Sequence, residues 1–196
     1  LQSQGHTLHC VAPKPNGIIN AADVARNVTS QTRLVSIMTA NNEIGTIQDI
    51  ADIAQSVKEQ NPHTLMHTDA CQAVPFVPLY PTEMNIDLCS LSASKMHGPK
   101  GVGALIIRRG VVIEPQLRGG GQEHGLRSGT EPVALIVGFA AALQLSVARR
   151  DRDVRRMKKL RDRLIDGICM QIPGARLNGD RKKRLPNNAN IFFPES

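Results

Sequence analysis

The stretch that decides the fold spans residues 90–101 and reads Ser-Leu-Ser-Ala-Ser-Lys-Met-His-Gly-Pro-Lys-Gly. An apolar run, residues 86–91, enters it with the composition of a buried strand. Gly98 and Pro99 then end the strand, because Gly reaches unusual φ values and Pro lacks an amide donor. Lys95 is therefore expected at a strand's carboxyl end, where open parallel α/β sheets bind ligands. A partly desolvated lysine there can attack a carbonyl carbon, although most lysines in turns are simply solvated.

The segments around this stretch alternate between strand and helix patterns. Apolar, β-rich runs predict strands at residues 6–12, 33–40, 64–70, 86–90 and 103–109. Capping and helical spacing predict a helix at residues 20–28, with Asn20 as N-cap, and another along residues 47–57. Strand, helix and strand in succession imply right-handed crossovers. The expected fold is α/β, with a mostly parallel sheet and flanking helices.

The last third of the chain predicts a long helical region. Pro132 opens a helix whose residues 133–148 are almost all apolar, and we expect them to be buried. Residues 149–170 place apolar side chains on one face and Arg and Lys on the other. We expect a hinge near Arg149 between these two parts.

That hinge divides the chain into two expected domains. Residues 1–148 form part of a large domain. Residues 149–196 form a linking helix and the beginning of a small, truncated α+β domain. Its strands are expected at residues 175–179 and 190–193, because these runs are short, apolar and bounded by Gly, Asn or Pro.

Charge and composition narrow the classes of function. The 196 residues carry a net charge of +7, and aromatic residues make up only 3% with no Trp. A stacking platform for single-stranded nucleic acid is therefore not expected. Residues 149–184 hold 14 basic and 5 acidic residues, so the basic excess belongs to one segment. A solvated helix face fits it best, and a module that binds nucleic acid or an acidic protein is the alternative from a different class.

Cysteine usage and hydropathy indicate a reducing compartment. The four cysteines, Cys10, Cys71, Cys89 and Cys169, show no CxxC spacing and sit among apolar neighbours, which predicts packing rather than disulfides or zinc. No run approaches 18 continuous apolar residues, so no membrane contact is expected. No signal peptide is visible. We expect a cytoplasmic protein, or an organellar one if a transit peptide precedes Leu1.

Three successive predicted strands end in polar side chains at the same edge of the sheet. They are Asn42, then Asp69 with Gln72, then Ser92, Ser94 and Lys95. One carboxylate without an imidazole cluster does not make a metal site. Pyridoxal phosphate would use every piece, because its aldehyde condenses with an amine and its ring nitrogen is kept protonated by a carboxylate. Amides suit its phenolic oxygen, and hydroxyls with a Gly-rich loop suit its phosphate.

Four motifs in this chain resemble those of the cysteine desulfurases. This family comprises class V aminotransferase-like enzymes of pyridoxal-phosphate fold type I and includes the closely similar selenocysteine lyases. The motifs are Asn-Asn-Glu-Ile-Gly at 41–45, His-Thr-Asp-Ala-Cys-Gln at 67–72, Lys95 with Gly-Pro-Lys-Gly at 98–101, and the loop 119–130. Their order and spacing match, and the resemblance covers nearly the whole chain.

The resemblance implies a role for each motif residue. Lys95 would be the Schiff-base lysine, Asp69 the partner of the ring nitrogen, Gln72 and Asn42 contacts on the phenolic-oxygen side, and Ser92 a phosphate ligand. Thr130 would reach the phosphate in the neighbouring subunit, because family members are homodimers. Ser94 stands where the family commonly has His, and its hydroxyl can still bond a phosphate oxygen.

The activity implied is removal of sulfur from L-cysteine, giving L-alanine and an enzyme persulfide for iron–sulfur clusters or tRNA. The implied partner is a sulfur acceptor or an iron–sulfur scaffold protein. A selenocysteine lyase or another class V aminotransferase is the alternative within the fold. Family members are about twice this long, and their sulfur-accepting cysteine and carboxylate-binding arginine have no counterpart here. The 196 residues alone are therefore expected to be inactive.

Overall fold

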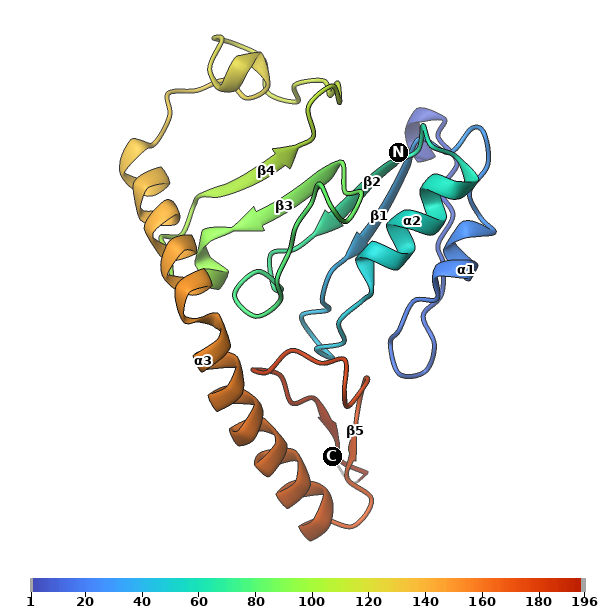
Figure 1. The fold of residues 1–196 in the computed structure, drawn as a ribbon, viewed down its shortest axis with the longest axis vertical. Helices are drawn as coiled ribbons and strands as arrows, with labels where there is room; N and C mark the ends of the chain where they lie inside the picture. Colours follow the sequence, from blue (N-terminus) through green and yellow to red (C-terminus); the bar gives the residue numbers. More distant parts are fainter. Residues whose placement is uncertain (1, 195–196) are drawn as a thin grey trace.

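A mostly parallel sheet forms the centre of the molecule, as the sequence predicts. The structure is a computed structural model that describes residues 2–194 (Figure 1). The sheet has the spatial order β1-β2-β3-β4. Its strands are β1 (Leu34–Met38), β2 (Leu65–Asp69), β3 (Leu88–Ser92) and β4 (Gly103–Ile107). The first three are parallel, and β4 is antiparallel to β3.

Two helices, α1 (Ala21–Ala25) and α2 (Ile50–Gln60), cover one face of this sheet (Figure 1). Asn20 is the N-cap of α1, as predicted, and its side chain accepts a hydrogen bond from the amide of Ala22. In α2, Ile53 and Val57 are buried and belong to the same apolar core as Met66 of β2. This packing follows from helical spacing on α2 and from alternation on β2.

The helix α3 (Val133–Gln171) is continuous and passes through Arg149 without a break. It packs on η2 (Ala93–Met96), a 3-10 helix that follows β3. The expected burial of residues 133–148 is wrong: Phe139 is buried, while Val133 and Val137 are more than 60% exposed. These two apolar side chains are therefore mostly open to solvent in the described chain. The domain boundary at residue 148 stays a prediction, and it falls within this helix.

Within residues 2–194, α3 is also the one helix long and apolar enough to span a membrane, judged by length and composition alone. Apolar helices of proteins outside membranes pass the same test. The expectation of no membrane contact therefore stays a prediction.

The chain ends in a small two-stranded antiparallel sheet beside the second half of α3 (Figure 1). It consists of β5 (Arg176–Leu177) and β6 (Ile191–Phe192), where the sequence predicts two strands. The strand predicted at residues 6–12 is wrong, because this segment is extended coil without a neighbouring strand among the described residues. Two further 3-10 helices, η1 (Gln2–Gln4) and η3 (Glu123–Gly125), complete the described structure.

Candidate functional site

Two neighbouring parallel strands bring a carboxylate and a hydroxyl to the same edge of the sheet. Asp69, the last residue of β2, lies opposite Ser90 of β3. Ser92 is two residues farther along β3, and alternate residues of a strand point to the same face. Asp69 and Ser92 therefore share one face, about 5 Å apart across the strands and about 7 Å along them. Lys95 follows three residues later.

The Asp69 carboxylate is held in place by the turn that follows it. The amide of Cys71 donates a 2.9 Å hydrogen bond to Asp69 Oδ1. The amide of Ala70 donates to the carbonyl oxygen of Ser90 at 3.0 Å, which ties the turn to β3. Ala70 and Ala73 are fully buried under the turn. The turn thus fixes the Asp69 carboxylate at the carboxyl end of the sheet.

Lys95 is presented outward by η2. Ala93 and Met96 of this helix are buried in the core, whereas Ser94 and Lys95 are exposed. The helix ends at His97, whose φ of 60° is left-handed. The hydroxyls of Ser92 and Ser94 lie 3.1 Å apart. The turn therefore offers an amine and a pair of hydroxyls next to the strand that carries Ser92.

The loop after β1 places Asn42 at the same edge. Its neighbour Asn41 caps the turn, because Asn41 Oδ1 accepts hydrogen bonds from the amides of Glu43 and Ile44, both at 2.9 Å. Asn42 is one position further on and is exposed, and its side chain has no hydrogen-bond partner within residues 2–194. Gln72 is half-buried in the turn after Asp69. Six predicted site residues thus lie at or just beyond the carboxyl ends of β1, β2 and β3.

Thr130 is not brought to these residues within one chain. The loop 119–130 follows β4, and because β4 runs antiparallel to β3, its carboxyl end lies at the opposite edge of the sheet. Figure 1 shows this loop extending away from the sheet before α3 begins. The role expected for Thr130, toward the phosphate of a neighbouring subunit, stays a prediction.

His67 lies two residues before Asp69 on β2, and its side chain therefore points to the same face of the sheet. Its ring bridges two hydroxyls, with Nδ1 at 2.7 Å from Ser36 Oγ and Nε2 at 2.9 Å from Ser90 Oγ. Burial lowers the pKa of His67, against the opposing effect of the Asp69 carboxylate. Within residues 2–194 no group of three or more metal-binding side chains gathers. The histidine therefore acts as a neutral hydrogen-bonding group beneath the site.

The two cysteines near the site are poor nucleophiles. Burial, followed by the neighbouring Asp69 carboxylate, raises the pKa of Cys71 to about 12. The same two causes raise the pKa of Cys89 to about 11. Because the thiolate is the reactive form, both side chains remain thiols at neutral pH. Cys89 is buried and Cys71 half-buried, in agreement with the predicted packing role, whereas for Cys10 and Cys169 that prediction is wrong because both are exposed.

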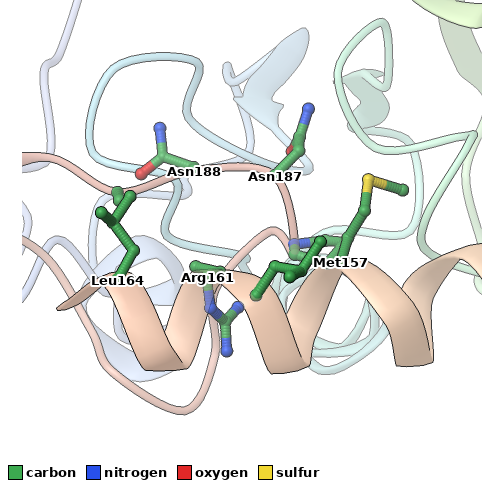
Figure 2. A pocket seen from close by; sticks show the side chains of 8 residues that line it. Met157, Arg161, Leu164, Asn187 and Asn188 are labelled. Atoms are coloured by element: carbon green, nitrogen blue, oxygen red, sulfur yellow. The ribbon is translucent and has the colours of Figure 1, made fainter. Parts of the chain in front are cut away.

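A second set of polar residues contacts the site from the end of the chain, and sequence reasoning missed it. The side chains of Asn188 and Asn190 donate hydrogen bonds to the carbonyl oxygen of Glu43, at 2.8 and 3.2 Å. Their loop also borders a shallow hollow of about 240 Å³ against α3, lined by residues such as Met157 and Leu164 (Figure 2). The only sequence signal was the Asn-rich run 187–190.

The basic segment 149–184 is partly used inside the molecule. Arg161 and Arg184 are buried, and Arg161 donates to the carbonyl oxygens of Arg184 and Leu185 at 3.1 and 3.0 Å. Arg150 donates to the carbonyl oxygen of Val74 at 3.0 Å. The Arg150 contact ties α3 to the sheet domain, and the Arg161 contacts tie α3 to the segment that follows it, so these three arginines are not free to form a basic surface.

Comparison with known proteins gives consistent matches over the whole chain. Residues 1–196 match the family Aminotransferase class-V. The cysteine desulfurase IscS of Clostridium botulinum is 44% identical over 195 residues, which are 98% of this chain and 49% of that protein. A solved NifS-like protein is 40% identical, with a TM-score of 0.95 over 100% of this chain and 53% of its own. The solved structure of SspA in complex with cysteine is 41% identical, with a TM-score of 0.70 over 73% of this chain and 41% of its own.

These matches define both the family and the extent of the chain. The chain spans about half the length of the curated relatives it matches. The match nevertheless includes every strand of the sheet and every motif at its carboxyl edge. With residues 1–196 covered from end to end, the chain belongs to the class V aminotransferase family.

Proposed function

We propose that this chain is the central part of a cysteine desulfurase that takes sulfur from L-cysteine and releases L-alanine. The observation that carries the proposal is that an exposed Lys95 and a fixed Asp69 carboxylate follow neighbouring parallel strands at one sheet edge of a class V aminotransferase chain. The name of the Clostridium relative and the cysteine complex of SspA support this choice of substrate.

The cofactor of this family is pyridoxal 5′-phosphate, and the donor set at the edge fits it. Lys95 would offer an amine for the aldehyde, and the Asp69 carboxylate suits the protonated ring nitrogen. The paired hydroxyls of Ser92 and Ser94 suit the phosphate. We assign Asn42 and Gln72 to the phenolic-oxygen side. When bound, the cofactor supplies an electron sink for bond breaking at the amino acid.

The protein's own residues then orient and move protons. Asp69 keeps its charge aimed at the site because the Cys71 amide fixes its other oxygen. Lys95 has room to shuttle a proton, since η2 anchors its backbone through Ala93 and Met96 while its side chain stays exposed. Positioned acid–base groups of this kind contribute about 10²–10⁴-fold to a rate.

We place the sulfur acceptor outside these 196 residues. The transfer converts L-cysteine and an enzyme thiol into L-alanine and an enzyme persulfide, so the C–S bond breaks and an S–S bond forms. It needs a thiolate, and the raised pKa values of Cys71 and Cys89 disfavour both. The exposed Cys10 and Cys169 belong to the N-terminal coil and the end of α3, not to the strand ends that carry Asp69 and precede Lys95. The 196 residues alone are accordingly proposed to bind poorly and to turn over no substrate.

The proposal also covers partners and location. A homodimer in which Thr130 reaches the neighbouring subunit's phosphate would give the exposed loop 119–130 a partner. The persulfide would pass to a sulfur acceptor or an iron–sulfur scaffold protein in the cytoplasm. Direct nucleic-acid binding is not part of the proposal, because aromatic residues make up only 3% of the sequence and offer no stacking platform for bases.

Borohydride trapping in the full-length protein tests the proposal. Pyridoxal phosphate is added, the sample is reduced, and peptide mapping locates the label. We expect the label on Lys95 and its loss in Lys95→Ala. Lys100→Ala is the matched control, since Lys100 is an exposed lysine of the same turn and should leave labelling unchanged. A label elsewhere, or none, would remove the enzyme assignment.

Product analysis separates the desulfurase from its alternatives. We expect equimolar alanine and persulfide sulfur from L-cysteine. A strong preference for selenocysteine would make the protein a selenocysteine lyase, and amino-group transfer to a keto acid would make it another class V aminotransferase.

A further inference from the structure

The loop 41–45, which presents Asn42, is shaped internally by Asn41. The side-chain oxygen of Asn41 accepts hydrogen bonds from two backbone amides. The backbone carbonyl oxygen of Asn41 accepts a third from the amide of Gly45, at 3.1 Å. This tight turn leaves the carbonyl oxygens of Asn42 and Glu43 facing outward. A loop this short is held on one side by β1 and needs support on the other.

That support comes from a segment about 145 residues away in sequence. Asn188 Nδ2 donates to the carbonyl oxygen of Glu43 at 2.8 Å and lies 3.5 Å from that of Asn42. The amide of Leu185 donates to the carbonyl oxygen of Gly45 at 2.8 Å. The approach is close enough to require glycine at 45, where φ is +71° and a Cβ would lie 2.5 Å from Asn188 Cγ.

The direction of the Asn188 carboxamide is set by a buried arginine. Arg184 is 3% exposed, and its Nη1 donates to Asn188 Oδ1 at 2.6 Å. Because a guanidinium only donates, the contacted atom must be the amide oxygen, and the amide nitrogen must face Glu43. Arg184 itself donates to the carbonyl oxygens of Asp180, at 2.9 Å, and Asn178.

The same segment is fixed to the long helix. Arg161 of α3 is 6% exposed and donates to the carbonyl oxygens of Arg184 and Leu185. Figure 2 shows Asn188 and Asn187 on the loop above Arg161 and Leu164 of α3. A continuous set of hydrogen bonds thus runs from α3 through Arg184 and Asn188 to the turn that carries Asn42.

We infer that Asn188, oriented by Arg184, is a positioning residue that holds Asn42 toward the cofactor. Asn188 touches the backbone of the loop and not the cofactor, so it acts only through Asn42. The inference rests on the proposed function, since it takes Asn42 as a cofactor contact. It also makes cofactor affinity depend on the segment 178–190, which lies beyond α3 in the chain.

A double-mutant cycle on cofactor affinity tests this inference. The dissociation constant of pyridoxal phosphate is measured by titrating the full-length apo-protein carrying Asn188→Ala, Asn42→Ala or both. Losing one hydrogen-bonding group at each site should weaken binding about five- to tenfold. Because Asn188 acts through Asn42, the double variant should bind no more weakly than Asn42→Ala alone. If the two factors multiply, or if Asn188→Ala binds as well as wild type, the inference is wrong.

Two further variants separate positioning from folding. Asn187→Ala is the matched control, because Asn187 is exposed and its side chain has no hydrogen-bond partner in the described structure. It should leave affinity unchanged. Asn188→Asp keeps the shape and the Arg184 contact but cannot donate to Glu43, so it should reproduce the loss seen with alanine even if Asn188→Ala folds poorly.

A lowered melting temperature with unchanged cofactor affinity would reduce Asn188 to a structural role. Wild-type protein that binds no pyridoxal phosphate would instead refute the proposed function itself.

Discussion

Asp69 enters the site with one carboxylate oxygen already occupied by the Cys71 amide. The remaining oxygen is the charged partner proposed for the cofactor ring. We expect Asp69→Asn to weaken pyridoxal phosphate binding about ten- to hundredfold, because a hydrogen bond to a charged group is lost. Titration of the apo-protein measures this. Asp52→Asn on the exposed surface of α2 is the control, and equal affinities in the two variants would contradict the role of Asp69.

His67 makes stability depend on pH in a defined window. Burial lowers its pKa below the ordinary value of 6.5, so the unfolded chain binds the proton more readily than the folded one. The stabilising contribution of the neutral ring is therefore complete above pH 6.5 and is lost as the pH falls through the lower folded value. We expect the unfolding free energy to decrease below pH 6.5, and this decrease to be smaller in His67→Gln. Urea unfolding between pH 5 and 8 measures it, and parallel curves for the two proteins would contradict it.

At the scale of single residues, the sequence predicts the position of those site residues that follow a strand closely in the sequence. The positions of Asp69 and Lys95 could be predicted because Asp69 ends β2 and Lys95 follows the end of β3 by three residues, and parallel strands bring their ends to one edge. Asn188 could not be predicted, because nothing local shows that it reaches Glu43 about 145 residues away. The fixing of one Asp69 oxygen by Cys71 also depends on turn geometry that sequence patterns do not reveal.

The elements of the sheet are joined by a buried charge network. Asp87 directly precedes β3 and is 4% exposed. Its carboxylate accepts three hydrogen bonds, from Lys58 Nζ of α2 at 2.6 Å, from the amide of Met66 at 2.7 Å and from Arg108 Nη1 at 3.2 Å. Burial alone would raise the pKa of Asp87, but these partners together lower it. One side chain thus connects α2, β2 and the end of β4.

Removing this carboxylate should be costly. We expect Asp87→Ala to lower the unfolding free energy by about 3–5 kcal/mol, because it leaves Lys58 and a strand amide without their buried partner. Arg108→Ala should cost about 1 kcal/mol or less, since that side chain is 42% exposed. Urea unfolding of the full-length protein gives both values. Similar losses of unfolding free energy in the two variants would show that the burial of a side chain does not determine its contribution to the stability of this network.

The sequence pattern predicts correctly whether a segment is a helix or a strand where that segment packs against another element. It predicts this less well where the segment has no such neighbour. The strands β2 and β3 and the helix α2 have apolar patterns that match the surfaces they bury, whereas the apolar residues of β4 are mostly exposed. The direction of β4 could not be read from its pattern, because an antiparallel edge strand has the same composition as a parallel one. Residues 6–12 have a strand composition, but no strand of residues 2–194 pairs with them, and a strand needs a partner for its backbone.

At the scale of the whole molecule, two elements expose large apolar side chains, a feature that often marks an interaction surface. These side chains lie on the first half of α3, with Val133 66% and Val137 62% exposed, and on β4, where Leu105 and Ile106 are more than 40% exposed. Since the relatives are about twice as long, we propose that the rest of the protein covers both surfaces rather than a membrane.

Comparing residues 1–196 alone with the full-length protein tests whether the rest of the protein covers the exposed face of α3. Residues 1–196 expressed alone should self-associate and bind a hydrophobic dye, and Val137→Lys should reduce both effects by placing a charge on the exposed face. In the full-length protein the same substitution should instead destabilise the fold by about 1–3 kcal/mol, because the lysine would be pressed against protein without a partner. Sedimentation and dye fluorescence measure the first result, and urea unfolding the second. If Val137→Lys leaves the full-length protein as stable as wild type, this face of α3 is open in the whole molecule and its cover must be sought outside the chain.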